Sequence, residues 1–99
     1  MANYRFSNKA VADLSDIWNY TYETWSEKQA DKYYLMLIDT CQELASKPQK
    51  GRKYDEVYPG LLGFRAYLHV VFYMVVSANE IEIVRILHGR MDIKKRLND

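Results

Sequence analysis

The stretch Ile81-Glu82-Ile83-Val84-Arg85-Ile86-Leu87-His88-Gly89-Arg90-Met91-Asp92 combines a β-strand pattern with an abrupt glycine corner. In a strand, successive side chains point to opposite faces of the sheet. Strict alternation predicts one face made of Ile81, Ile83, Arg85 and Leu87, and another made of Val84, Ile86 and His88. An arginine in an apolar row needs a carboxylate partner or a route to water for its head group. The corner also leaves His88 and Arg90 together at one strand end.

Two further strands precede this one, and short links join all three. The pattern predicts strands over about 63–68, 69–76 and 80–87, with Ser77-Ala78-Asn79 as a hairpin turn. The apolar run Val70–Val76 is too short to cross a bilayer but suits a buried central strand. Links of this length favour an antiparallel meander.

Two amphipathic helices precede the three strands. After a short strand at Tyr4–Phe6, Ser7 is the expected N-cap of a helix that ends near residue 24. Ser26 and Gln29 form a capping-box pair for a second helix, which ends near residue 47. The expected apolar stripes are Val11, Leu14, Trp18, Tyr22 and Trp25 on the first helix, and Ala30, Tyr34, Leu37, Cys41 and Leu44 on the second. A link of one or two residues between them predicts an antiparallel helix hairpin.

These elements predict a single α+β domain over residues 1–99, in the order β-α-α-β-β-β, with the helix hairpin packed on a small antiparallel sheet. The hairpin can cover one face of the sheet, so the other face should stay partly open. In the long connection from Pro48 to about Leu61, the stretch Lys50–Lys53 is interpreted as a solvated turn. Asp92 is expected to cap a last helical turn over Ile93–Leu97.

Composition places the chain among ordinary folded proteins. Its 99 residues are 48% hydrophobic and 27% charged, and the nine tyrosines are an excess that hints at partner binding. The net charge is +1, with a balance of −2 over residues 1–47 and +3 over residues 48–99. This positive charge in the C-terminal half is small compared with the basic surfaces of dedicated nucleic-acid binders. One cysteine excludes an internal disulfide, and the N-terminal segment lacks a signal-peptide pattern, so we expect a cytoplasmic protein.

The residue types near the glycine corner also permit a ribonuclease site. Such a site needs proton transfer at the ribose 2′-hydroxyl and cations that hold the phosphate. His88 and His69 are the candidates for proton transfer, and Arg65, Arg85 and Arg90 are those for phosphate. These residues are sufficient but not diagnostic. No metal site is expected, because His69, His88 and Asp92 lack a compact ligand spacing, and no cofactor loop is recognisable.

The sequence resembles the ParE toxins of the RelE/ParE superfamily, also known as plasmid stabilisation proteins, over nearly its whole length. The most specific match is the string from Ile81 to Asp92. Weaker matches occur in the same order as in the family, at Ala12-Asp13-Leu14, Ile17–Tyr20, Trp25-Ser26, Gln29-Ala30, Lys47-Pro48, Gly51-Arg52, Asp55-Glu56, Pro59-Gly60, Arg65, His69 and Phe72-Tyr73. The resemblance implies the same fold that the periodicity predicts.

The resemblance also implies a function: a toxin that inhibits DNA gyrase and blocks replication. A cognate ParD-like antitoxin neutralises such a toxin in a hetero-oligomer, and the toxin reaches DNA only indirectly through that antitoxin. Cofactors, metals and membranes have no part in this expectation. The residues expected to bind the target or the antitoxin are Arg65, His69, Arg85, His88, Arg90 and Met91.

Two alternatives to gyrase inhibition stay open at this stage. The related RelE branch cleaves messenger RNA on the ribosome, and its catalytic candidates here are His88, Arg85 and Arg90. This chain departs from the RelE pattern, because it has His69 where RelE-type toxins carry an arginine, and no tyrosine after Asp92 matches their catalytic one. The chain could also be a non-toxic member that keeps antitoxin binding. Gyrase inhibition needs no acid–base site, so we expect a protein that is not an enzyme.

Overall fold

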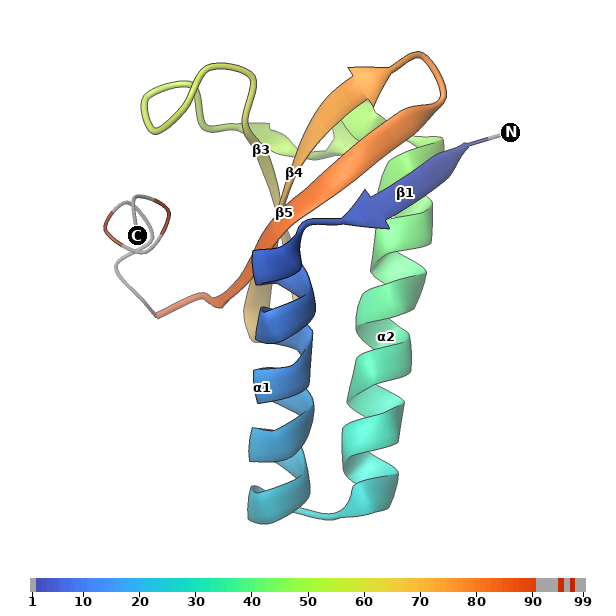
Figure 1. Cartoon of the computed structure of the whole chain (residues 1–99), viewed down its shortest axis with the longest axis vertical. Helices are drawn as coiled ribbons and strands as arrows, with labels where there is room; N and C mark the ends of the chain where they lie inside the picture. The colour runs from blue at the N-terminus through green and yellow to red at the C-terminus, as the bar shows by residue number, and fades with distance from the viewer. Residues whose placement is uncertain (1, 91–94, 96, 98–99) are drawn as a thin grey trace.

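A computed structural model of the chain describes residues 2–90, 95 and 97. Its elements are β1 (Asn3–Phe6), α1 (Asn8–Thr24), α2 (Glu27–Ser46), a 3-10 turn η1 (Pro48–Lys50), β2 (Arg52–Lys53), β3 (Leu62–Ala66), β4 (His69–Ser77) and β5 (Glu80–His88). Figure 1 shows α1 and α2 side by side, with one half of the hairpin against the sheet and the other half extending past it. The predicted α+β fold and helix hairpin are confirmed.

The sheet has five strands in the order β1-β5-β4-β3-β2. Strands β3, β4 and β5 form the predicted antiparallel meander. The sheet as a whole is mixed, because β1 pairs in parallel with β5, from Asn3 opposite Glu80 to Phe6 opposite Ile83. The expectation of a solvated turn at Lys50–Lys53 was partly wrong, since Arg52 and Lys53 form the short strand β2 against β3.

Serine caps start both helices as the sequence predicts. The Ser7 hydroxyl oxygen accepts a hydrogen bond from the Ala10 amide at 3.0 Å and donates its own proton to the Val84 carbonyl at 2.7 Å. The Ser26 hydroxyl oxygen accepts from the Gln29 amide at 3.1 Å. Ser7 therefore both begins α1 and attaches its first turn to β5.

The apolar stripe predicted for α1 was largely wrong. Ala10 and Leu14 are the buried residues of α1, and Ile17 packs partly buried beside them. Val11 and Tyr22, which the prediction placed inside, are 51% and 50% exposed. The predicted stripe follows the large side chains and is rotated from the face that is buried, because a small residue such as Ala10 adds little to a hydrophobic pattern. The part of the hairpin that lies beyond the sheet (Figure 1) also has no sheet to cover its apolar side chains. The stripe of α2 is confirmed, except that Tyr34 is 39% exposed.

Strict alternation along β5 was also wrong, because the strand contains a bulge. Phe72 of β4 lies opposite Arg85, whereas the next residue, Tyr73, lies opposite Ile83, so Val84 is the extra residue. After the bulge, each residue of β5 lies on the opposite face from the one that strict alternation predicts. Three isoleucines of β5 consequently belong to the core under the helices, and Leu87 belongs to the core on the other face.

The sheet face away from the helices is less open than predicted. A second buried cluster lies there, composed of Leu61, Val70, Phe72 and Leu87. Tyr54 and Val57, from the connection before β3, pack on it, and so does Leu97. Lys95 and Leu97 are helical, as expected for the last turn, whereas Asp92 and Met91 lie outside the described residues.

Candidate functional site

The end of β5 and the turn between β3 and β4 form one compact unit, which we call the strand-end corner (residues 65–69 and 88–90). The Gly89 amide donates to the Leu68 carbonyl at 2.9 Å. The Arg65 guanidinium lies flat against Gly89, where a Cβ atom would come within 2.8 Å of Nη1, and its Nε donates to the Tyr67 carbonyl at 2.8 Å. Glycine at position 89 therefore allows an arginine from another strand to cover the corner.

His69 is held as a neutral hydrogen-bond acceptor. Its Nδ1 lies 2.7 Å from the Tyr33 hydroxyl, which itself accepts from the Leu68 amide at 3.2 Å. A tyrosine hydroxyl that accepts from the Leu68 amide can also donate its own proton, and we assign Nδ1 of the neutral imidazole as the acceptor. Burial, and then the neighbouring His88, lower the pKa of His69 to about 4, with Arg65 adding to the effect and Asp13 opposing it. The imidazole is thus uncharged at neutral pH.

His88 and Arg90 complete the corner. The rings of His88 and His69 meet edge to face, with 5.3 Å between their centroids. His88 Nδ1 accepts from the Arg90 amide at 3.1 Å, and Arg90 is exposed. The corner therefore presents two arginines, Arg65 and Arg90, beside a pair of imidazoles whose Nδ1 atoms are both occupied.

Arg85 lies elsewhere, between β5 and α1. Its Nε and Nη2 donate to the two carboxylate oxygens of Asp13 at 2.9 and 3.1 Å, and Asp13 also accepts from the Ile86 amide at 2.9 Å. The Arg85 and Asp13 side chains are only 14% and 12% exposed. The arginine in the apolar row thus has a carboxylate partner, and the pair attaches α1 to the sheet. Among the predicted site residues, Arg65, His69, His88 and Arg90 come together, and Arg85 does not join them.

A hollow of about 810 Å³ lies between the corner and the protruding half of the helix hairpin. Its apolar lining includes Ile17, Tyr20, Trp25, Tyr33 and Leu68, and its polar lining includes Asp16, Gln29, His69, His88 and Arg90. Tyr20 and Trp25 are 68% and 74% exposed. The excess of tyrosines in the sequence predicted partner binding, but no spacing in the sequence placed Tyr20 and Trp25 beside the corner.

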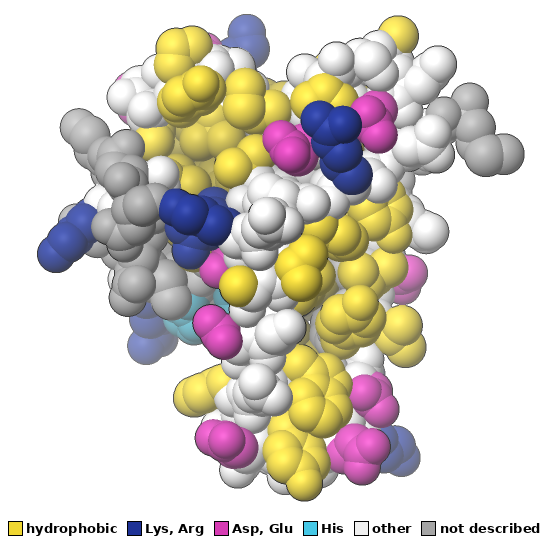
Figure 2. Space-filling view, in the orientation of Figure 1, with side chains coloured by type: hydrophobic (Ala, Val, Ile, Leu, Met, Phe, Trp, Pro, Cys, Tyr) yellow, Lys and Arg dark blue, Asp and Glu magenta, His cyan; other side chains and the backbone are white. Residues whose placement is uncertain are grey.

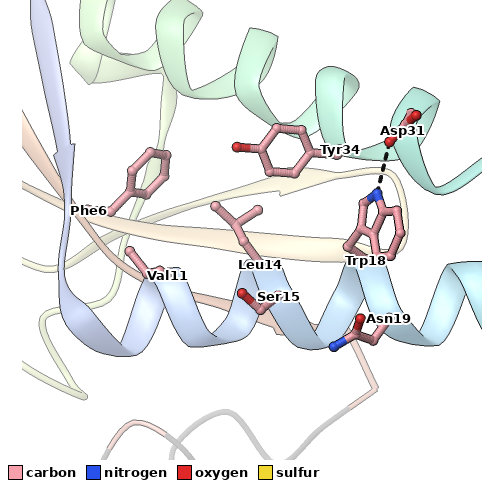
Figure 3. A pocket seen from close by; sticks show the side chains of 8 residues that line it. All are labelled: Phe6, Val11, Leu14, Ser15, Trp18, Asn19, Asp31 and Tyr34. Carbon is pink, nitrogen blue, oxygen red and sulfur yellow. Dashed lines mark hydrogen bonds between the residues drawn. The ribbon is translucent and has the colours of Figure 1, made fainter.

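A second hollow, of about 490 Å³, runs between α1 and α2 on the side shown in Figure 3, and we call it the helix groove. It is lined by Phe6, Val11, Leu14, Ser15, Trp18, Asn19, Asp31 and Tyr34. Trp18 fixes one end, since its indole N–H donates to Asp31 at 3.0 Å and its ring stacks on Tyr22. Hydrophobic side chains are visible along the helices in Figure 2.

The remaining candidates offer no reactive centre in the described part of the chain. Cys41 is fully buried, and burial raises the pKa of its thiol to about 12, so it is an unreactive core residue. Residues 2–90, 95 and 97 contain no cluster of three or more His, Cys, Asp or Glu side chains arranged to hold a metal ion. Within the same residues, neither helix has the length and apolar character that crossing a bilayer requires.

Known proteins match this chain over nearly its whole length. Residues 4–93 match the family described as "ParE toxin of type II toxin-antitoxin system, parDE". The chain is 38% identical to "Toxin ParE1" of Mycobacterium tuberculosis (strain H37Rv), over 97% of this chain and 98% of that protein. It is 36% identical to "Toxin ParE1" of Caulobacter vibrioides, over 98% of this chain and 99% of the relative.

A solved structure entitled "Chromosomal ParDE TA system from P. aeruginosa" shares the fold, with a TM-score of 0.75, 21% identity, and coverage of 89% of this chain and 96% of that chain. The helix hairpin on a sheet is therefore common to both. Together with the family match over residues 4–93, these comparisons show that the chain belongs to the ParE toxin family of type II toxin–antitoxin systems.

Proposed function

We propose that this chain inhibits DNA gyrase and that a cognate ParD-like antitoxin neutralises it in a hetero-oligomer. The proposal rests on family membership and on one structural observation at the strand-end corner. Arg65 and Arg90 are exposed there, while the Nδ1 atoms of His69 and His88 are occupied by Tyr33 and by the Arg90 amide. Such a corner is better suited to binding a charged partner surface than to transferring protons.

The corner and its hollow together supply the parts of a protein-binding site. Arginine and exposed aromatic side chains are the types enriched at binding hot spots, and here Arg90, Tyr20 and Trp25 line one hollow. We propose this surface as the site for gyrase, with Arg65, His69, His88 and the adjacent Met91 contributing. Arg85 contributes indirectly, by holding α1 against β5. The toxin would act in the cytoplasm and contact DNA through its partners.

The test is a gyrase supercoiling assay with purified toxin, together with growth measurements after induction. We expect the wild-type chain to block supercoiling and stop growth. Arg90→Ala should weaken inhibition by at least about tenfold, because a central arginine at an interface contributes more than 1.4 kcal/mol. Arg52→Ala is the matched control, because Arg52 is also exposed but lies on β2, where it packs over Tyr54.

Three results would contradict the proposal. Normal supercoiling with cleavage of ribosome-bound messenger RNA would identify a ribonuclease instead. Growth without arrest on expression would indicate a non-toxic member. Equal loss of inhibition in the Arg90 and Arg52 variants would remove the corner from the site. Antitoxin binding is tested separately by thermal unfolding, since a saturating ligand of the folded state must raise Tm.

A further inference from the structure

The turn between β3 and β4 has an unusual backbone. Ala66 at the end of β3 lies opposite His69 at the start of β4, so Tyr67 and Leu68 alone form the turn. Tyr67 has a φ of +59°, which is the left-handed conformation that glycine adopts readily and that other residues adopt at a cost in free energy. In two-residue hairpin turns such a position usually belongs to glycine, asparagine or aspartate. A tyrosine here therefore lowers the stability of the fold.

Three hydrogen bonds hold this turn in its strained conformation. The Tyr67 carbonyl accepts from Nε of Arg65 at 2.8 Å. The Leu68 amide donates to the Tyr33 hydroxyl at 3.2 Å, and the carbonyl of the same residue accepts from the Gly89 amide at 2.9 Å. Strained backbone persists where its surroundings fix it, and such positions cluster at functional sites. Here the residues that fix the turn are those that build the strand-end corner.

Both side chains of the turn are exposed, although both are large and mainly apolar. Tyr67 is 54% exposed and Leu68 is 58% exposed. The Tyr67 ring meets the Tyr33 ring edge to face, with 6.1 Å between the centroids, which offsets part of the backbone cost but leaves more than half of the residue in water. Leu68 lines the hollow that Tyr20 and Trp25 also line. Large apolar side chains exposed together in one place are typical of an interaction surface.

The two imidazoles of the corner present hydrogen-bond donors to the same hollow. Nδ1 accepts from Tyr33 in His69, and it accepts from the backbone in His88. An uncharged ring whose Nδ1 accepts carries its proton on Nε2. Neither Nε2 atom is hydrogen-bonded within residues 2–90, 95 and 97, and no buried side-chain nitrogen in this part of the chain lacks a partner. Both Nε2–H groups therefore reach the solvent, and both rings line the hollow beside Arg90.

The chemistry of this surface limits what can bind to it. Two imidazole N–H donors and the Arg90 guanidinium are suited to a carboxylate, and the exposed turn is suited to an apolar side chain next to that carboxylate. A nucleic-acid strand is a poorer fit, because its binding requires several cations along the backbone. The whole chain has a net charge of only +1, and Asp16 lines the hollow from α1.

From this juxtaposition we propose that the Tyr67–Leu68 turn, the Nε2–H groups of His69 and His88, and Arg90 form the recognition site for an acidic segment of gyrase. In this segment a bulky apolar residue is next to an aspartate or glutamate. The apolar residue packs on the turn, and the carboxylate accepts hydrogen bonds from the imidazoles and from Arg90. This inference rests on the proposed inhibition of gyrase and names the chemistry of the partner. Tyr67 is retained in a strained position because its ring contributes to binding.

The turn is tested by comparing variants of the purified chain in the gyrase supercoiling assay and in thermal unfolding. Tyr67→Gly removes the ring and relieves the backbone, so inhibition should weaken by at least about tenfold while Tm stays equal to or above that of wild type. Tyr67→Phe keeps the ring and should inhibit within about threefold of wild type. Tyr58→Gly is the matched control, because Tyr58 is 58% exposed but lies in the connection at the other end of β3, so its loss should leave inhibition unchanged.

The carboxylate is tested with two peptides, acetyl-Leu-Asp-Leu amide and acetyl-Leu-Asn-Leu amide, which differ only in that group. NMR of the imidazole nitrogens of the purified chain reports binding. At millimolar concentrations the aspartate peptide should shift the Nε2 resonances of His69 and His88, and the asparagine peptide should shift them at least about fivefold less.

The outcomes separate this inference from the proposed function. A Tyr67→Gly variant that inhibits as wild type does, or that unfolds several degrees below it, overturns the role of the turn in binding. Equal shifts from the two peptides, or shifts from neither, overturn the carboxylate site. A single-stranded oligonucleotide that shifts the same resonances more strongly than the aspartate peptide assigns the site to nucleic acid and overturns the inference. In each of these cases gyrase inhibition by the wild type stands, whereas a wild-type chain that leaves gyrase active overturns the proposed function itself.

Discussion

His69 should make the stability of the fold depend on pH, although it is neutral at physiological pH. Its pKa is about 4 in the folded chain and 6.5 in an unfolded one. Between these pH values the unfolded chain binds a proton at His69 that the folded chain does not bind, so lowering the pH favours unfolding. The contribution is fully present above pH 6.5 and is lost as pH falls toward 4.

The size of the effect follows from the shift. A difference of about 2.5 pKa units corresponds to roughly 3.4 kcal/mol, which is an upper limit. The imidazole is only partly buried, so solvent screening reduces this value, and we expect a loss of about 1.5 kcal/mol between pH 7 and pH 4.5. Protonation would also remove the acceptor that Tyr33 uses, because Nδ1 would then carry a proton.

The assay is urea unfolding of the wild type and of His69→Gln at pH 7.0, 6.0, 5.0 and 4.5. Glutamine retains an oxygen that can accept from Tyr33 but does not titrate, so the difference between the two proteins isolates the histidine from all carboxylates. The free energy of unfolding should fall more steeply for the wild type, by about 1.5 kcal/mol over this range. Two curves that run parallel within about 0.3 kcal/mol would refute the reasoning.

Two further variants and one labelling experiment test the contacts that build the fold. Asp13→Asn should lower the free energy of unfolding by about 2–3 kcal/mol in urea titrations, because Arg85 would be left without its nearly buried carboxylate; a loss under about 0.5 kcal/mol would mean that the pair is dispensable. Gly51→Ala should lower Tm by several degrees, since the added methyl group would collide with the Tyr73 hydroxyl; an unchanged Tm would contradict this. Native Cys41 should react with a thiol reagent at pH 8 at least about 100-fold more slowly than after unfolding, and rapid labelling of the folded chain would show that the thiol is not buried.

Periodicity predicted the main elements of this fold because most of them follow simple local rules. Ser7 and Ser26 cap their helices as their positions suggest, and the turn before Glu80 joins an apolar run to a strand of alternating side chains. The partner of β1 could not be predicted in the same way. A four-residue strand carries no signal for its neighbour, and here the free edge of β5 decides the pairing.

The wrong assignments of buried faces on β5 and α1 share one cause. Periodicity assumes that a helix or strand is regular along its length and packs against its neighbour over its whole length. The bulge at Val84 shifts the alternation by one residue and moves Leu87 to the opposite core. On α1, the helix continues past the end of the sheet (Figure 1), and Trp18 and Tyr22, which repeat with helical spacing, stack on each other outside the core. Helical spacing of aromatic side chains therefore does not by itself identify the core.

The candidate site was predicted in its residue types but not in its arrangement. The sequence placed His88 and Arg90 at one strand end, yet it could not show that Arg65 reaches Gly89 from another strand or that Tyr33 reaches His69 from α2. Both contacts span long separations in the chain, and neither leaves a spacing signal. The glycine is the one local clue, since a Cβ atom at position 89 would require the Arg65 side chain that rests on it to move. The corner is assembled from β3, β5 and α2, so it forms only when the helices pack on the sheet. The Asp13–Arg85 pair lies outside the corner but contributes to that packing, because it attaches α1 to β5.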